Sequence, residues 1–268
     1  CRMIIYRAIG WLLALCFLLV GRPVNAQSPY QIHWPQEAAY YAAGGASLGL
    51  GAYLRTRTPL FTTDELTTLD PHDINPFDRI ATRWHSQAAH EASNYLWYGS
   101  HVLPFTLLAG REMREDFPTL VVLYSETVLI NAGATLVTKY LFERPRPFVF
   151  DQITATDKKL TPNAKASFVS GHTSMTAANT FFVAKVFSDY HPDSPWKPVV
   201  WTAAASIPAV TGFLRVRGGR HYPTDVIGGY VLGGLIGYFV PHLHRRSAHH
   251  RELTIVPTPG GLHLTWGL

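Results

Sequence analysis

The sequence predicts an all-α protein, an antiparallel bundle of about six helices with its active site at one end. Three observations point to this fold. The chain has 268 residues and is 47% apolar, which is ample for a sizeable core. Its apolar residues gather in stretches of helical length, and polar turn residues separate these stretches. Clusters of charged residues stand where the helical stretches begin or end, so packing of successive helices would bring them together.

The first 26 residues are typical of an export signal. Arg2 and Arg7 form a basic start, residues 11–20 are apolar, and residues 24–26 suit a small-residue cleavage site. A retained membrane anchor is the alternative, although the apolar run is short for a span. We therefore expect a signal peptide at 1–26, a single helical domain at 27–248 and a tail at 249–268.

Cysteine usage and charge exclude several classes of protein. Cys1 and Cys16 both lie in the signal segment, so the exported chain would hold no disulfide, no thiolate metal site and no catalytic cysteine. Removal of Arg2, Arg7 and Arg22 lowers the Lys and Arg count from 23 to 20, against 18 acidic residues. A net charge of about +2 indicates no nucleic-acid partner.

The first predicted helix covers residues 36–53, where Gly44, Gly45, Gly49 and Gly51 suit close packing against a neighbouring helix. Residues 56–76 form a polar connection. Its acidic residues lack the spacing of a hand-type calcium loop, so four residues of this region are predicted to be turn and cap residues: Asp70, Asp73, Asn75 and Asp78.

Residues 77–110 predict one long helix or two shorter ones. Its aromatic cluster of Tyr95, Trp97 and Tyr98 is more typical of core or interface packing than of a ligand pocket. A helix over 119–142 follows, in which Glu126 and Asn131 are expected to be paired structural polar residues rather than catalytic groups.

The remaining helices are predicted at 171–190, 199–213 and 226–240, after an irregular loop at 148–167. Residues 242–251 hold four histidines and three arginines and are expected to form a solvated basic tail. The last residues predict a small hairpin or a loose tail.

The stretch from Leu214 to Asp225 concentrates residues that suit phosphate chemistry. Pro223 fits the first turn of a helix, and His221 and Asp225 lie four residues apart, so the carboxylate can accept a hydrogen bond from the ring. A carboxylate on one ring nitrogen leaves the other nitrogen as a nucleophile. Arg215 and its neighbouring arginines offer donor forks for a phosphate. A basic helix cap with a structural His–Asp pair is the alternative.

Two further stretches of the sequence favour a catalytic site over a structural His–Asp pair. Lys139 and Arg146 close one apolar run, and Ser170, Gly171 and His172 open another. Each stretch lies at a predicted helix end, so antiparallel packing would gather the cations Lys139, Arg146 and Arg215 around a phosphate-sized hole. The helix that starts at Ser170-Gly171-His172 would add backbone N–H donors and a favourable dipole.

Over about residues 80–243 the chain resembles the type 2 phosphatidic acid phosphatases, a family related to bacterial non-specific acid phosphatases and vanadium haloperoxidases. The three parts of the family signature fall here on Lys139, Arg146 and Pro147, then on Ser170, Gly171 and His172, and last on Arg215, His221 and Asp225. Val169 stands where the second part has proline, and Leu214 stands where the third part has serine.

The resemblance implies a mechanism and a role for each matched residue. His221 would attack phosphorus and form a phosphohistidine, while Asp225 orients its ring. His172 would protonate the leaving oxygen and then activate the water that releases phosphate. The phosphate would be bound by five residues: Lys139, Arg146, Ser170, Gly171 and Arg215. Because fixed cations neutralise the phosphoryl oxygens, no metal and no cofactor are expected.

The expected function is a metal-independent phosphatase of phosphomonoesters or diphosphates, of lipids in the first place. The alternatives are a soluble periplasmic non-specific acid phosphatase, a vanadium-dependent haloperoxidase and a non-catalytic phosphate binder. The expected partner is a phosphorylated lipid or a small phosphomonoester. The motifs do not identify the leaving group of the reaction or the oligomeric state.

Membrane association is expected, with the active site facing the periplasm. The apolar stretches at 226–240 and 95–110 fall short of the ~20 residues of a full span, so the bundle is predicted to contact the envelope membrane without a fixed mode of insertion. The basic residues after the last helix lie at the end away from the site, and the positive-inside rule puts such an end in the cytoplasm.

Overall fold

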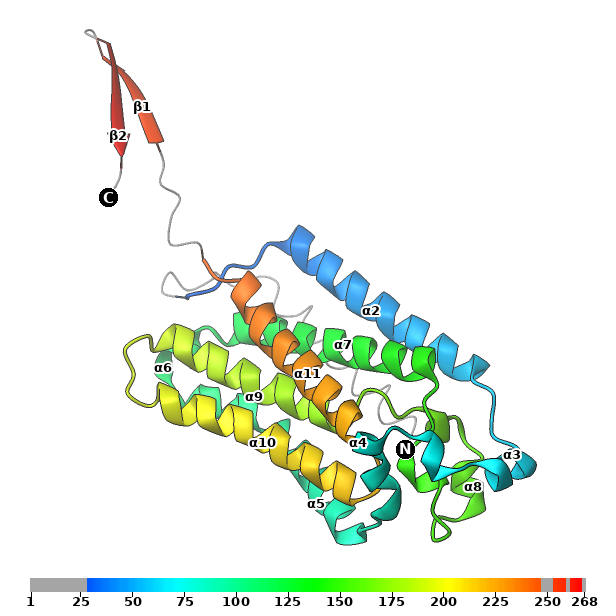
Figure 1. The fold of residues 1–268 in the computed structure, drawn as a ribbon. Helices are drawn as coiled ribbons and strands as arrows, with labels where there is room; N and C mark the ends of the chain where they lie inside the picture. Colours follow the sequence, from blue (N-terminus) through cyan, green and yellow to red (C-terminus); the bar gives the residue numbers. More distant parts are fainter. Residues whose placement is uncertain (1–27, 247–252, 259–260, 267–268) are drawn as a thin grey trace.

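The computed structural model describes residues 28–246, 253–258 and 261–266, and the predicted signal segment lies outside these ranges. Its long helices form one bundle (Figure 1): α2 (Trp34–Arg57), α5 (Gln87–Ser100), α7 (Phe117–Phe142), α9 (Gly171–Tyr190), α10 (Lys197–Arg217) and α11 (Pro223–Leu243). Short helices connect them: α3 (Thr63–Thr68), η1 (Pro71–Asp73), α4 (Pro76–Arg79), η2 (Ile80–Arg83), η3 (Leu103–Ala109), α6 (Arg111–Glu115), η4 (Pro147–Val149), α8 (Thr156–Lys159) and η5 (Pro162–Lys165). The prediction of an all-α bundle is confirmed.

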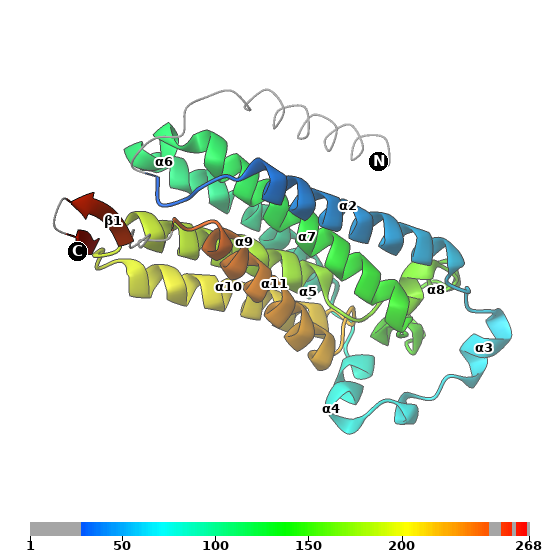
Figure 2. The same cartoon turned by 90° about the horizontal axis from the view of Figure 1, so that it is seen from above.

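The last four long helices alternate in direction, as predicted. The Tyr124 hydroxyl of α7 donates to Asn179 of α9, whereas Thr135, later in α7, meets Ser174, earlier in α9. The end of α7, the start of α9, the end of α10 and the start of α11 therefore share one end of the bundle, where α4 and α8 also lie (Figure 2). Helix α2 runs parallel to α7, since Tyr41 contacts Val122 and Gly51 faces Leu136.

Helices α9 and α11 pack backbone against backbone. Every fourth residue of α11 on this face is glycine, and a Cβ added at Gly229, Gly233 or Gly237 would come within 2.5 Å of a carbonyl oxygen of Ser170, Ser174 or Ala178 respectively. Small residues at this spacing permit the closest approach of two helices. This contact fixes the start of α11 against the start of α9.

The predicted close packing of the first helix is confirmed at Gly44 and Gly51, whereas a Cβ added at Gly45 or Gly49 would meet nothing within 4 Å. A Cβ at Gly44 would lie 2.9 Å from Leu129, and a Cβ at Gly51 would lie 2.8 Å from Leu136. Gly133 of α7 completes the contact, because its added Cβ would lie 2.9 Å from the oxygen of Gly44. Helix α2 thus packs along α7, as Figure 1 also shows.

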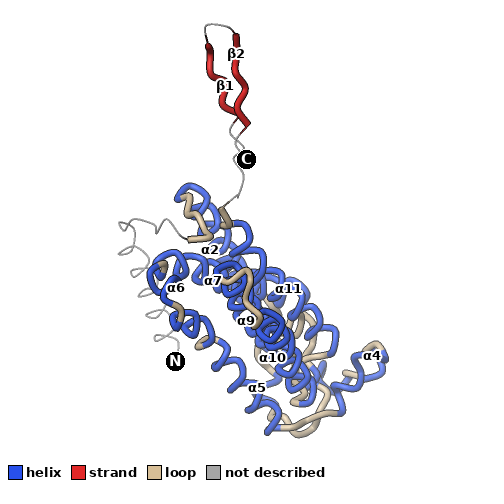
Figure 3. Tube along the Cα trace, turned by 90° about the vertical axis from the view of Figure 1, so that its left-hand side faces the viewer, coloured by secondary structure: helices blue, strands red, loops and turns tan. Residues whose placement is uncertain are grey.

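Residues 77–110 divide further than the sequence indicated. The Ser86 side chain caps α5 by accepting from the backbone N–H of Ala89, and Pro104 stands in the first turn of the separate helix η3. Helix α5 lies along the bundle near α10 (Figure 3). In the preceding connection, Asp70 and Asn75 cap helices as predicted, but Asp78 is fully buried and belongs to the site described below.

Among the described residues, three helices have the length and hydropathy of membrane spans: Phe117–Phe142, Lys197–Arg217 and Pro223–Leu243. The last two exceed the predicted apolar stretches because each helix continues through polar or proline-containing turns at its ends. On α11, residues spaced four apart leave an apolar row exposed along the whole helix: Ile227, Val231, Leu235, Phe239 and Leu243. An exposed apolar row of this length is typical of a surface that contacts a membrane or another protein.

The residues after α11 are less solvated than predicted. His244 is 5% exposed, and its Nε2 lies 2.9 Å from Oε2 of Glu37 and 3.3 Å from Oε2 of Glu126. The prediction of a solvated tail is therefore wrong at His244, whereas the prediction that Glu126 is a paired structural residue holds. Beyond this point, β1 (Leu253–Thr258) and β2 (Gly261–Trp266) form an antiparallel hairpin, the first of the two predicted alternatives.

Candidate active site

The three motifs meet at one end of the bundle. Lys139 lies in the last turn of α7, His172 in the first turn of α9, Arg215 in the last turn of α10, and Asp225 in the first turn of α11. The backbone N–H of Ser170 donates to the backbone carbonyl oxygen of Asp225 over 2.9 Å. This hydrogen bond joins the second and third motifs directly.

Lys139 and Arg146 hold the chain that leads into α9. Lys139 Nζ donates to the backbone carbonyl oxygen of Ala166 over 2.9 Å and to that of Val169 over 2.7 Å. Arg146 donates from Nη2 to Asn163 over 3.0 Å and is 7% exposed. Both cations are therefore held at the site by the loop that separates the first motif from the second.

The helix start at Ser170 has the form that the sequence predicted. Ser170 is fully buried, and its hydroxyl lies 2.9 Å from that of Thr173. A Cβ at Gly171 would lie 3.4 Å from Lys139 Cε, so glycine leaves more room beside the lysine. Val169, which replaces the family proline, is buried at 3% exposure.

Arg215 is 3% exposed and is held by α5. Its Nη1 lies 3.0 Å from Nδ1 of His90 and 3.3 Å from the hydroxyl of Ser93. Because a guanidinium can only donate, His90 accepts at Nδ1 and is neutral. Burial, followed by the charges of Arg220 and Arg215, lowers the pKa of His90 to about 4, in agreement with that state.

His172 faces the same helix. Its Nε2 lies 2.9 Å from Oδ1 of Asn94, and the Trp97 ring lies against the imidazole with the centroids 5.0 Å apart. Burial lowers the pKa of His172 to about 2, and the charges of Arg215 and then Arg146 add to this effect. A bound dianion would neutralise those cations and raise this pKa again.

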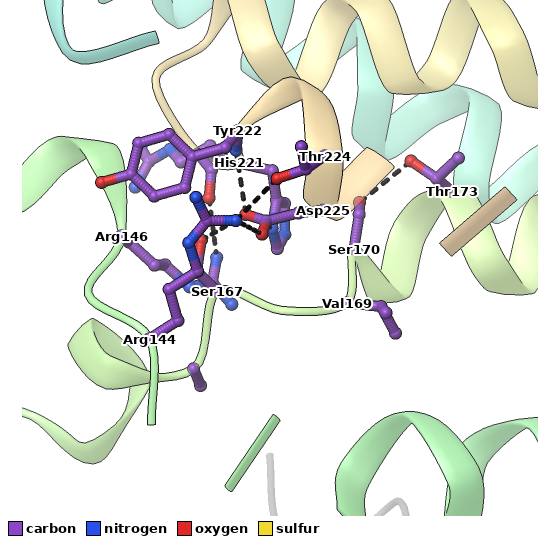
Figure 4. Close-up of polar contacts among 12 residues, drawn as sticks. Arg144, Arg146, Ser167, Val169, Ser170, Thr173, His221, Tyr222, Thr224 and Asp225 are labelled. Atoms are coloured by element: carbon purple, nitrogen blue, oxygen red, sulfur yellow. Dashed lines mark hydrogen bonds and ion pairs between the residues drawn. The ribbon is translucent and has the colours of Figure 1, made fainter. Parts of the chain in front are cut away.

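His221 and Asp225 lie together, at a longer distance than a strong hydrogen bond. His221 Nδ1 is 3.5 Å from Asp225 Oδ2, and the two side chains are 1% and 0% exposed. The carboxylate also accepts from the Ser167 hydroxyl and from the Tyr222 N–H (Figure 4). Burial, followed by the charges of Arg146 and Lys139, holds the pKa of His221 well below its usual range, so the ring is neutral and carries a nucleophilic lone pair.

Arg144 supports Asp225 from the other side (Figure 4). It donates to Asp225 Oδ1 over 2.6 Å and to Asp78 Oδ2 over 2.7 Å, and its guanidinium stacks on the Tyr222 ring at 4.2 Å. Asp78 also accepts from the N–H and the hydroxyl of Thr224. The start of α11 is thus bound to α4 by a buried ionic network.

Several buried donors at the site have no hydrogen-bond partner among the described residues. They are Nε of Arg146, Nε of Arg215, Nε of Arg220, Nδ1 of His221 and the hydroxyl of Tyr222. Buried polar groups are nearly always paired, so a cluster of orphaned donors calls for an explanation. Three guanidinium groups that keep unused N–H donors are suited to an oxyanion.

The sequence motifs did not point to every residue of this site. Arg144 and Asp78 hold Asp225, Arg220 adds a cation, and α5 contributes contacts to Arg215 and His172. One pattern in the sequence could have indicated the contribution of α5. His90, Ser93, Asn94 and Trp97 stand at i, i+3, i+4 and i+7, and residues at this spacing share one face of a helix. The prediction that Trp97 serves only packing was incomplete, since its ring lies on His172.

One group of described residues has the arrangement of metal ligands. Glu37, Glu126 and His244 offer ligand atoms that all lie within 4.8 Å of one another, and all three residues are buried. They lie at the opposite end of α11 from His221.

The chain matches the PAP2 superfamily over residues 120–248, a range that contains all three motifs. It is 30% identical over 165 residues to phosphatidylglycerophosphatase B of Bacillus subtilis (strain 168), covering 59% of this chain and 75% of that protein. It is 36% identical over 104 residues to undecaprenyl-diphosphatase BcrC of the same organism, covering 38% of this chain and 46% of that protein.

A solved structure, of a transmembrane PAP2 type phosphatidylglycerolphosphate phosphatase from Bacillus subtilis, has a TM-score of 0.45 and 20% identity over 75% of this chain and 94% of that chain. The sequence matches define this chain as a phosphatase. It belongs to the PAP2 superfamily, and the resemblance stated from the motifs is confirmed.

Proposed function

We propose that this chain hydrolyses lipid phosphomonoesters or diphosphates without a metal ion, through a phosphohistidine on His221, with its active site on the periplasmic face of the membrane. The observation that carries the proposal is the set of orphaned guanidinium donors beside two histidines whose pKa is lowered, His221, which is buried, and His172, which is partly buried. Phosphoryl transfer needs cationic donors at the equatorial oxygens and one reactive group at each apex. The site supplies both sets from fixed side chains.

The reaction runs in two displacements. In the first, the lone pair on Nε2 of His221 forms the N–P bond while the bond from phosphorus to the leaving oxygen breaks, and protonated His172 gives its proton to that oxygen. In the second, neutral His172 takes a proton from water, the water oxygen attacks phosphorus, and the N–P bond breaks to release phosphate. Asp225 stabilises the charge that develops on the His221 ring. Lys139, Arg146, Arg215 and the N–H groups of Ser170 and Gly171 bind the phosphoryl oxygens.

A lipid substrate is supported by two observations. Both relatives are named as phosphatases of lipid phosphates, a phosphatidylglycerophosphate and an undecaprenyl diphosphate. Three helices have the length and hydropathy of spans, and α11 exposes an apolar row along its whole length. A bundle that lies in the bilayer would present its site to phosphate groups at the membrane surface.

The periplasmic orientation rests on charge. Arg245 and Arg246 follow α11 at the end away from His221, and basic residues next to a span favour the cytoplasm. The site, at the start of α11, would then face the opposite side. The N-terminal segment, with its basic start and apolar run, is proposed to act as an export signal.

Phosphate release from three substrates tests the proposal: phosphatidic acid and undecaprenyl diphosphate in detergent, and 4-nitrophenyl phosphate in buffer. We expect activity that survives EDTA and that vanadate inhibits competitively, because vanadate would occupy the phosphate hole. Activity lost with EDTA and restored by a divalent ion would contradict a metal-free reaction. Efficient halide oxidation with vanadate and peroxide would favour the haloperoxidase alternative, and phosphate binding without turnover would favour a binding protein.

A further inference from the structure

One face of α5 forms a wall of the active site, although α5 lies outside residues 120–248, where the family match falls. Four residues at helical spacing make this wall: His90, Ser93, Asn94 and Trp97. The first two contact Arg215, and the last two contact His172. The wall therefore supports a phosphate-binding arginine at one point and the proposed general acid at the other.

The contact between Asn94 and His172 decides which ring nitrogen is used. Nε2 of His172 lies 2.9 Å from Oδ1 of Asn94, a normal hydrogen-bond length. With Oδ1 as the acceptor, Nε2 carries a hydrogen in the neutral ring and also in the imidazolium. The second proton is then gained and lost at Nδ1.

The same contact helps to charge the ring. Burial and the neighbouring cations disfavour the imidazolium form of His172, which a general acid requires. An amide oxygen that accepts from Nε2–H is a better partner for the imidazolium than for the neutral ring, because the charged ring is the stronger donor. Trp97 covers the ring beside this hydrogen bond and limits its rotation.

We propose that Asn94 is a positioning residue for His172: it holds Nε2, sets Nδ1 as the nitrogen that gives the proton to the leaving oxygen, and favours the protonated ring. The inference rests on the proposed role of His172 as the general acid. It adds a residue from outside the family signature to the machinery of leaving-group protonation.

The test compares two leaving groups. Phosphatidic acid leaves an alkoxide that needs a proton, whereas 4-nitrophenyl phosphate leaves a stable phenolate. We expect Asn94→Leu to slow phosphoenzyme formation from phosphatidic acid by about 10–100-fold, the loss that misplacement of a reactive group causes. It should slow phosphoenzyme formation from 4-nitrophenyl phosphate by less than about threefold, because nitrophenolate leaves without a proton. Tyr95→Leu is the matched control, since Tyr95 is the next residue of α5 and is 75% exposed; it should change neither rate.

A second variant separates positioning from a general loss of structure. In Asn94→Asp a carboxylate replaces the amide oxygen and stabilises the imidazolium more strongly. We expect turnover of phosphatidic acid to persist, with the alkaline limb of its pH profile shifted to higher pH. An unchanged limb in Asn94→Asp, or equal losses on both substrates in Asn94→Leu, would overturn the inference, as would an Asn94→Leu enzyme of normal activity.

His172→Ala distinguishes a failure of this inference from a failure of the proposed function. The readout is the rate of phosphoenzyme formation, because loss of the base in the second displacement lowers overall turnover of both substrates in His172→Ala. If His172→Ala spares phosphoenzyme formation from 4-nitrophenyl phosphate and Asn94→Leu does not, His172 remains the acid and only the role of Asn94 is wrong. If His172→Ala slows phosphoenzyme formation from both substrates equally, the proposed general acid is itself wrong. The expected result is the same substrate pattern in both variants, with the larger loss in His172→Ala.

Discussion

Nη1 of Arg144 donates to Oδ1 of Asp225 over 2.6 Å, while the other carboxylate oxygen lies 3.5 Å from Nδ1 of His221. The carboxylate that faces the proposed nucleophile is thus held by an arginine that is not part of the family signature. Arg144 in turn binds Asp78, so the orientation of His221 depends on α4, more than 140 positions earlier in the chain.

Arg144→Met should therefore cost both stability and activity. The substitution leaves two buried carboxylates, Asp225 and Asp78, without their cation, and breaking a buried ion pair costs about 3–5 kcal/mol. We expect this loss in the free energy of unfolding measured by denaturant titration in detergent, with a fall in kcat. Arg111→Met is the control, because the Arg111–Glu115 pair is exposed and should give no measurable change. Full stability in Arg144→Met would show that the network does not hold the start of α11.

The alanine variants of the two histidines should lose activity at different steps of the reaction. His221→Ala removes the attacking atom and should abolish turnover of every substrate, whereas His172→Ala should still form a phosphoenzyme from 4-nitrophenyl phosphate and accumulate it. Asp225→Asn should lower kcat by about 10²–10⁴-fold, as for other carboxylate-oriented histidines. Rapid-quench trapping of acid-labile phosphohistidine measures all three. Normal phosphohistidine levels in His221→Ala would mean that another residue is the nucleophile.

Acid should destabilise the site in a predictable direction. The pKa of His90 is about 4 in the folded protein, whereas an unfolded histidine titrates near 6.5. The unfolded chain therefore binds more protons between these values, so this contribution to stability is complete above about pH 6.5 and is lost as the pH falls toward 4. Between pH 7 and 5, the Tm of His90→Gln should fall less steeply than that of the wild type. Parallel curves would contradict the assignment of a neutral His90.

Two neighbouring glycines of α11 allow a test of the close contact between α9 and α11. A Cβ at Gly233 would lie 1.8 Å from the oxygen of Ser174, whereas a Cβ at Gly234 would lie 3.7 Å from the Phe181 ring. Gly233→Ala should therefore destabilise the bundle by about 1–3 kcal/mol or more, the usual cost of overpacking. Gly234→Ala should be neutral or stabilising, because alanine favours the helix. Equal unfolding curves for the two variants would contradict the close approach of these helices.

Orientation in the membrane can be measured with single cysteines. Cys1 and Cys16 can be changed to serine, and no other cysteine is present. Lys158 is exposed in the short helix α8 at the end of the bundle that holds the site, and Asp193 is exposed in the turn between α9 and α10 at the far end. In spheroplasts, an impermeant maleimide should label Lys158→Cys and spare Asp193→Cys until the membrane is opened. The reverse pattern would place the active site in the cytoplasm.

The sequence by itself determined the helical class, the order of the long helices and the eight residues first proposed for the site. Helical periodicity and apolar content decide the first two, because each depends on residues that are near one another in the chain. Close packing of the first helix was predictable for the same reason, since small residues gather there, but only the structure shows that Gly44 and Gly51 make the contact.

Only the tertiary structure decided which distant side chains support that site. Asp78 follows a helix-capping asparagine and has the sequence pattern of a turn residue, yet folding buries it against Arg144 and Thr224. His244 stands in a basic tail, yet it packs between Glu37 and Glu126 from two other helices. Asn94 and Trp97 come within reach of His172 only when α5 packs on α9. Contacts between helices far apart in sequence depend on how whole helix faces pack, and no local pattern encodes that arrangement.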